Sequence, residues 1–199
     1  MKSKERCIQR ARELGCEYQG TLVGCAHSSF SAVMDALREE GIELVSPVVQ
    51  NEIFKSIIGL TGGCGNMHEG TCGAVMGSAF AIGLATGIGL KRQENDRGKH
   101  TWLTSYWVKQ GVAEKFLKIY GSIICREIML SRWGVAYCSQ YPGRSKEFFS
   151  HCGKVGCRNP SECVISNGAG FGAEAVWDYL ENKEDLSWVW EKYQPVENI

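Results

Sequence analysis

A stretch without any charged residue, running from Thr71 to Leu90, is the feature that most constrains the fold of this chain. It opens with Cys72-Gly73-Ala74-Val75-Met76-Gly77 and is dotted with further glycines. Such a segment approaches the length of a membrane span, but the glycines dilute its hydrophobicity and the flanking segments are charged. We therefore expect a central helix buried on all sides and no membrane span. A thiol at the start of this helix would be biased toward thiolate by the unpaired N–H groups there.

The composition favours redox or metal chemistry over nucleic-acid binding. Lysine plus arginine and aspartate plus glutamate number 22 each, so no basic excess recommends nucleic acid. The first residues, Met1 to Arg6, lead into a charged amphipathic segment without an apolar signal core, so we expect a cytoplasmic protein. Ten cysteines are unusual in that compartment, where thiols stay reduced, and they indicate metal binding or redox chemistry.

Helical periodicity prevails along the chain and no convincing strand alternation is found, so the predicted fold class is all-α. We expect one helical domain over residues 1–199, a compact bundle around the central Gly/Ala-rich helix. A loop-rich cysteine-containing insertion is expected over residues 131–159. Further helices are predicted at Lys4–Leu14, Ser29–Glu40, Pro47–Ile57 and Thr101–Tyr120, from Asn159 onward, and at 185–193.

The segment Cys72 to Gly77 matches a CGAxxG signature, and the chain thereby resembles the C_GCAxxG_C_C family, whose members are expected to be redox-active. A related domain in split-Soret cytochromes carries an iron–sulfur cluster. The resemblance covers roughly Leu22 to Leu180 and implies a [2Fe-2S] or [4Fe-4S] cluster held by four distant cysteines. In this sequence they fall on Cys25, Cys72, Cys125 and Cys163, with Cys64 as the substitute ligand.

The same residues are chemically reasonable without the resemblance. Iron–sulfur clusters usually take four thiolates, which need not be close in sequence. Cys72 and Cys163 each lie near a predicted helix start, where N–H groups can hydrogen-bond sulfur. The alternative is that Cys72 is only a small residue in a tight helix crossing.

Other side chains offer additional or alternative chemistry. Cys138, Cys152 and Cys157 are candidates for a second metal site holding a cluster or zinc, although their spacing follows no standard pattern. His27 and His68 are weaker candidates for proton transfer or ligation; a loop histidine is more often only solvated.

Three functions remain open from the sequence. The first is an iron–sulfur protein that transfers electrons to or from a partner oxidoreductase, with a homodimer expected around the small-residue helix. The second is a redox enzyme that uses an open cluster site or a reactive thiol pair on a small substrate. The third is a zinc-stabilised binding or regulatory module.

Overall fold

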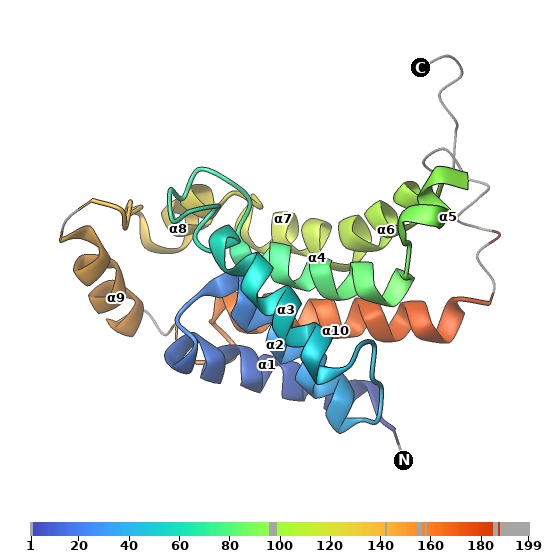
Figure 1. The fold of residues 1–199 in the computed structure, drawn as a ribbon. Coiled ribbons are helices and arrows are strands. Elements are labelled where there is room, and N and C mark those ends of the chain that lie inside the picture. Colours follow the sequence, from blue (N-terminus) through green and yellow to red (C-terminus); the bar gives the residue numbers. More distant parts are fainter. Residues whose placement is uncertain are drawn as a thin grey trace.

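Helices make up the architecture of the computed structural model, which describes residues 2–95, 99–141, 143–154, 157, 159–184 and 187 (Figure 1). No strand occurs in these ranges, and the all-α prediction is confirmed. The elements are α1 (Lys4–Thr21), α2 (Cys25–Glu39), α3 (Pro47–Ile57), the 3-10 turn η1 (Ile58–Leu60), α4 (Gly73–Thr86), α5 (Leu90–Asn95), α6 (Lys99–Val108), the π-helical segment η2 (Lys109–Ala113), α7 (Glu114–Tyr120), α8 (Cys125–Trp133), α9 (Arg144–Lys154) and α10 (Val164–Asn182).

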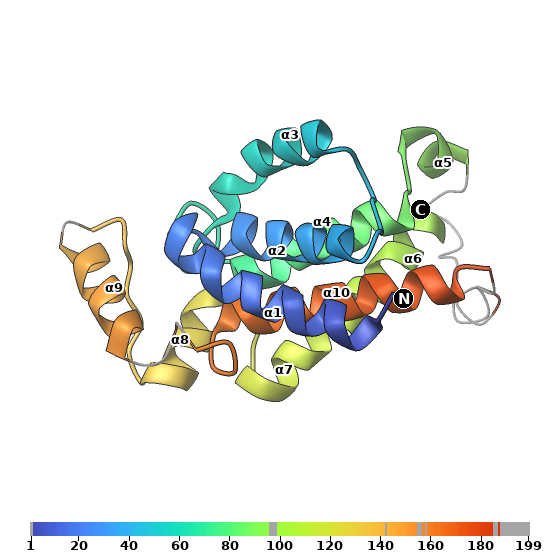
Figure 2. The ribbon, with the colours of Figure 1, turned by 90° about the horizontal axis from the view of Figure 1, so that it is seen from below.

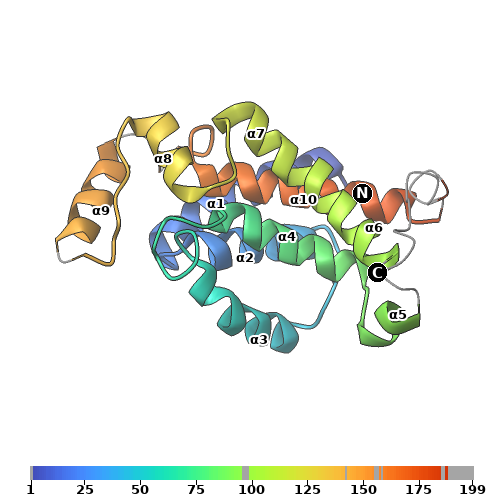
Figure 3. The same cartoon turned by 90° about the horizontal axis from the view of Figure 1, so that it is seen from above.

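The core lies between α1, α2, α4 and α10, which pack side by side (Figure 2). Apolar side chains from each of them are fully buried, among them Ala11, Phe30, Ile82 and Val176. The segment α6–η2–α7 crosses over α4 and α10 (Figure 3). Burial of this apolar surface is the main stabilising contribution to the bundle.

Helix α4 is the central Gly/Ala-rich helix that the sequence predicts. A Cβ atom placed on Gly77 would come 2.0 Å from the carbonyl oxygen of Ala26 in α2. On the other side of α4, where it packs against α10, a Cβ on Gly168 would come 2.7 Å from the carbonyl oxygen of Ala74. Only glycine allows the backbones to approach so closely, and α4 is therefore held tightly between α2 and α10.

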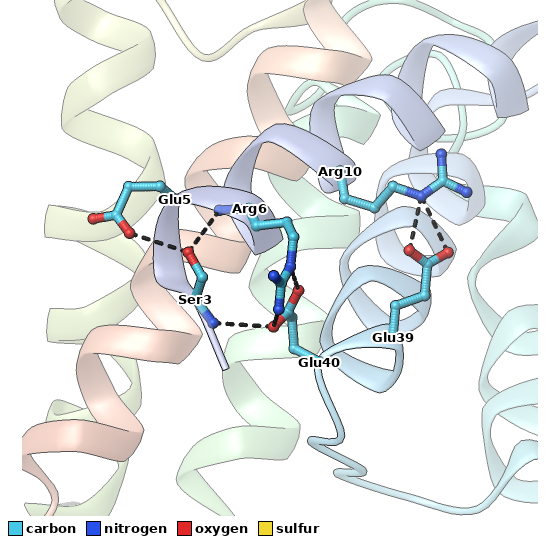
Figure 4. A network of polar contacts seen from close by, with 6 residues as sticks. All are labelled: Ser3, Glu5, Arg6, Arg10, Glu39 and Glu40. Carbon is cyan, nitrogen blue, oxygen red and sulfur yellow. Dashed lines mark hydrogen bonds and ion pairs between the residues drawn. The ribbon is translucent and has the colours of Figure 1, made fainter. Parts of the chain in front are cut away.

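The start of α1 is joined to the end of α2 by a polar network (Figure 4). The Arg6 guanidinium donates hydrogen bonds to both carboxylate oxygens of Glu40, one of them at 2.6 Å. The backbone N–H of Ser3 donates to the same carboxylate at 3.0 Å. Arg10 pairs with Glu39 at 2.8 Å on the exposed side. The hydrogen bonds from Arg6 and, to a smaller extent, from the Ser3 N–H lower the pKa of Glu40 to about 2.

Several sequence expectations need correction in detail. The first helix runs past its expected end at Leu14 to Thr21, and the second begins at Cys25 instead of Ser29. The helix expected over Thr101–Tyr120 is interrupted by η2, where Gly111 lies against Ala175 of α10 with no room for a side chain. The region 131–159, predicted to be loop-rich, contains the outlying helix α9 (Figure 1). The helix predicted from Asn159 begins at Val164. The helix expected at 185–193 lies outside the described residues.

None of the helices in the described part of the chain combines the length and the apolar character that crossing a membrane requires.

Candidate metal centre

Four cysteines occupy the same kind of backbone position, the beginning of a helix. Cys25 and Cys125 are the first residues of α2 and α8. Cys72 and Cys163 are the residues that cap α4 and α10 at their N-termini. The unpaired N–H groups and the positive end of the helix dipole stabilise negative charge at such a position. The helix starts therefore offset part of the cost of placing negative charge on these sulfur atoms.

Three of these thiols meet at one cavity. Cys25, Cys72 and Cys125 line a cavity of about 300 Å³ between the starts of α2, α4 and α8. The Cys25 Sγ accepts a hydrogen bond from the backbone N–H of Gly62 at 3.3 Å. Gly73 lies so close that an added Cβ would be 2.2 Å from that sulfur. The absence of a side chain at Gly73 is therefore needed for Cys25 to reach this place.

Backbone hydrogen bonds fix Cys72 and Cys125 relative to each other. The N–H of Cys72 donates to the carbonyl of Ile123 at 2.7 Å, and the N–H of Cys125 donates to the carbonyl of Gly70 at 2.9 Å. Thr71 and Ile124 form an isolated antiparallel bridge between the same segments. This short bridge holds Cys72 and Cys125, which are far apart in sequence, together at one end of the bundle.

Burial makes free thiolates unfavourable at this site. It raises the pKa of Cys72 to about 12, and the thiolate charge of Cys25 adds to this effect. Burial also raises the pKa of Cys25 and that of Cys125, where the charges of Cys72 and Cys25 contribute. The thiolates repel one another, so a bound cation would remove this repulsion, and binding it would release protons.

His68 supports Cys125 from the loop before α4. Its Nδ1 lies 3.4 Å from the Cys125 Sγ, and its Nε2 lies 2.9 Å from the Ser139 hydroxyl. If the Ser139 hydroxyl donates to Nε2, Nδ1 carries the proton and donates to the sulfur. The ring is buried and its pKa is lowered by that burial, so the neutral form is favoured. The backbone φ of His68 is positive, at 64°, and Cys64 and Asn66 of the same loop also have positive φ values.

His27 has a different environment. Its Nε2 lies 3.0 Å from the carbonyl oxygen of Leu22, and its Nδ1 lies 3.4 Å from the Thr61 hydroxyl. The ring is buried beneath Gly24 and against Phe54. These contacts fix the turn that precedes Cys25, and His27 is not among the described residues that line the cavity.

Cys163 lies deeper, beside the cavity. It is fully buried, its Sγ donates to the Gln19 side chain at 3.0 Å, and the Ser166 N–H donates to that sulfur at 3.5 Å. Burial raises its pKa to about 12. Its charge also raises the pKa of Cys72, so the two sulfur atoms are electrostatic neighbours. Its neighbours Val164 and Ile165 line the cavity.

The remaining cysteine candidates separate into two groups. Cys64 is exposed, and Cys138 is half-buried; neither is among the described residues lining the cavity. Cys152 and Cys157 are buried and do line it. The sequence makes these two, together with Cys138, candidates for a second metal site, and in the structure Cys152 and Cys157 line the same cavity as Cys25. Gln19 and Arg132, which also line it, carry no sequence signal that could have singled them out.

The donor set can be tested against the groups that the sequence suggests. Among the described residues, no three or more His, Cys, Asp or Glu side chains lie close enough together to hold a single metal ion. A zinc ion needs all its sulfur ligands about 2.3 Å from one point. A cluster distributes its thiolates over several iron atoms, so its ligands need not converge on one point. Thiols at separate helix starts around one cavity are the ligand type that both iron–sulfur clusters and zinc take.

The fold and this cavity define an all-helical protein with a buried, cysteine-lined site at one end of the bundle. The chain belongs to the C_GCAxxG_C_C family, whose model, described as "Putative redox-active protein (C_GCAxxG_C_C)", matches residues 23–159. No curated protein and no solved structure matched the chain. The match includes Cys25, Cys72 and Cys125 and confirms the family expected from the CGAxxG signature.

Proposed function

We propose that this protein is a cytoplasmic iron–sulfur redox protein that transfers electrons to or from a partner oxidoreductase. Its proposed ligands are Cys25, Cys72, Cys125 and Cys163, and its proposed cofactor is a [2Fe-2S] or [4Fe-4S] cluster. The observation that carries this proposal is the meeting of Cys25, Cys72 and Cys125, each at a helix start, around one cavity. When bound, the cluster would supply one-electron redox chemistry.

The chain's own residues would set the conditions for that chemistry. Cys72 and Cys163 are buried and Cys25 and Cys125 are half-buried, which limits access of water, and a lower dielectric strengthens the influence of nearby charges and dipoles. The N–H of Gly62 and the imidazole of His68 each lie within hydrogen-bonding reach of a ligand sulfur. Hydrogen bonds to cluster sulfur stabilise the reduced, more negative state and raise the reduction potential.

Cys163 is proposed as the fourth ligand in preference to Cys64. It caps α10, it is buried, and its charge acts on Cys72. Neither Cys64 nor Cys163 is among the described residues that line the cavity, but Cys64 is exposed, whereas Val164 and Ile165 next to Cys163 do line it. To reach a shared cluster, the Cys163 side chain would exchange its hydrogen bond with Gln19 for a bond to iron.

Purification under anaerobic conditions, with iron, sulfide and zinc analysis and an electron paramagnetic resonance spectrum, tests the proposal. We expect iron and acid-labile sulfide in the purified protein. Serine substitutions of Cys25, Cys72, Cys125 or Cys163 should lose or alter the spectrum, whereas Cys64→Ser should keep it. Stoichiometric zinc without sulfide would instead support the zinc-stabilised module and contradict the proposal.

A redox enzyme is the second candidate, favoured by the cavity beside the thiols. Its wall includes His68 and the aromatic side chains of Phe148 and Phe149, which could accommodate a small substrate. A change in the spectrum on adding an exogenous iron ligand such as cyanide would show an open iron position. An unchanged spectrum would favour electron transfer alone.

A further inference from the structure

Two cysteines on the outer wall of the cavity form a close pair. Cys152 lies in the last turn of α9 and Cys157 follows the end of that helix. Both are reduced, both are buried, and both line the cavity. The backbone N–H of Cys157 donates to the carbonyl of Cys152 at 3.2 Å, so the two residues are joined directly. A disulfide requires such proximity of the two backbones.

The two thiols of this pair are chemically unequal. The interaction between the two thiols lowers the pKa of Cys157 and raises that of Cys152. The Arg132 guanidinium, which also lines the cavity, acts on the Cys157 pKa in the same direction through its charge. The thiolate is the nucleophile in disulfide exchange, so Cys157 is suited to attack and Cys152 to resolve.

A route to the pair exists along the cavity wall. Val23 and Phe149 line the cavity and are 56% and 54% exposed, so the cavity reaches the surface at these side chains. Cys157 itself is only 5% exposed. A small or extended disulfide is thus a better match for this site than the folded surface of a large protein.

We propose that Cys152 and Cys157 form a dithiol–disulfide couple that exchanges two electrons with a small disulfide entering the cavity. The Cys157 thiolate attacks one sulfur of the disulfide RSSR, the S–S bond breaks, and RS⁻ leaves. The Cys152 thiol then loses its proton, its sulfur attacks the Cys157–SR bond, and a second RS⁻ leaves. In sum the protein dithiol is oxidised to a disulfide, and RSSR is reduced to two RSH, with the required protons coming from the dithiol and solvent.

This inference goes beyond the proposed function because it needs no cluster. It also differs from the second metal site expected from sequence, in which the same thiols would bind a cluster or zinc. The couple predicts that oxidation joins Cys152 and Cys157 in a disulfide, whereas the metal site predicts that both sulfur atoms stay bound to metal. Iron and sulfide content, measured on the same sample, reports on the proposed function separately.

Titration of the purified full chain with oxidised glutathione, followed by peptide mass mapping, tests the couple. We expect a Cys152–Cys157 disulfide in the wild type. Cys152→Ser should trap glutathione on Cys157, and Cys157→Ser should abolish both products. Cys64→Ser, which changes an exposed cysteine that does not line the cavity, is the matched control and should form the disulfide normally.

Several results would overturn the couple. One is a wild-type protein that forms no Cys152–Cys157 bond in excess oxidised glutathione. Another is a disulfide from Cys157 to Cys163, or to Cys16, whose Sγ lies 4.0 Å from the Cys157 carbonyl oxygen. A third is stoichiometric zinc that shields Cys152 and Cys157 until a chelator removes it. Formation of the Cys152–Cys157 disulfide in the wild-type protein is the deciding result. The inference is therefore tested even if one of the variants fails to fold.

Discussion

Gly73 and Cys25 are in direct contact: a Cβ on Gly73 would lie 2.2 Å from the Cys25 Sγ and 2.8 Å from the N–H nitrogen of Ala26. The contact joins the starts of α4 and α2 at the cavity. It explains why a residue without a side chain follows Cys72, because any larger residue would displace the sulfur of Cys25. The CGAxxG signature thus serves packing as well as chemistry.

Gly73→Ala should displace Cys25 and reduce the iron and sulfide bound per chain. Overpacking of this kind costs about 1–3 kcal/mol, so the melting temperature should also fall. Gly83→Ala is the control in the same helix, since nothing lies within 4 Å of its added Cβ. It should keep the iron and stabilise the protein by about 0.5–1 kcal/mol. Equal iron content in both variants would contradict the role given to Gly73.

Gly77→Ala should destabilise the fold more than it changes the site. The added Cβ would meet the Ala26 carbonyl oxygen at 2.0 Å and the Ser29 hydroxyl at 2.2 Å, forcing α2 and α4 apart. We expect a loss in the free energy of unfolding of about 1–3 kcal/mol, measured by urea denaturation. An unchanged unfolding midpoint would show that α2 and α4 are not packed in this way.

His68→Asn should lower the reduction potential of a bound cluster without releasing its iron. Asparagine tolerates the positive φ of 64° at this position, but its shorter side chain removes the imidazole that lies 3.4 Å from the Cys125 sulfur. Losing a hydrogen bond to ligand sulfur disfavours the reduced state. Protein-film voltammetry measures the shift. A potential equal to that of the wild type would show that His68 does not donate to the sulfur.

The stability of the protein should depend on Glu40 in acid. The folded-state pKa of Glu40 is about 2, below its ordinary value of 4.5, chiefly because Arg6 and the Ser3 N–H bind the carboxylate. Its contribution is therefore fully present above pH 4.5 and is lost as the pH falls from 4.5 toward 2.

Glu40→Gln should accordingly lower the melting temperature at pH 7, and the difference from the wild type should shrink across that acid window. Glu39→Gln is the neighbouring control, because Glu39 pairs with Arg10 on the exposed surface and should have a smaller effect. A difference that stays constant from pH 7 to pH 2 would contradict the coupling of α1 to α2 through Glu40.

Local signals in the sequence were sufficient to predict several of the helices. Ser46-Pro47 predicts the start of α3, and the Ser46 hydroxyl indeed accepts a hydrogen bond from the Val49 N–H at 3.4 Å. The glycine-dotted stretch after Cys72 predicts the buried central helix α4. Capping and composition act within a few residues, so they can be read without knowledge of the tertiary structure.

The parts that escaped prediction depend on contacts between distant segments. The interruption at η2 follows from the packing of Gly111 on Ala175, which no local pattern reveals. A loop was expected in place of α9 because its segment mixes aromatic residues, glycines and cysteines, and the helix lies outside the core formed by α1, α2, α4 and α10. Cys152 and Cys157 reach the cavity that Cys25 also lines through α8 and α9, and no local pattern reveals this arrangement.

The ratio of acid-labile sulfide to iron in anaerobically purified protein tests the central claim most directly. Both cluster types predict a ratio of about one. We expect that ratio in the wild type and in Cys64→Ser, and loss of both elements in Cys72→Ser. Wild-type protein that is fully folded yet contains iron without sulfide, or neither element after reconstitution with both, would contradict the account.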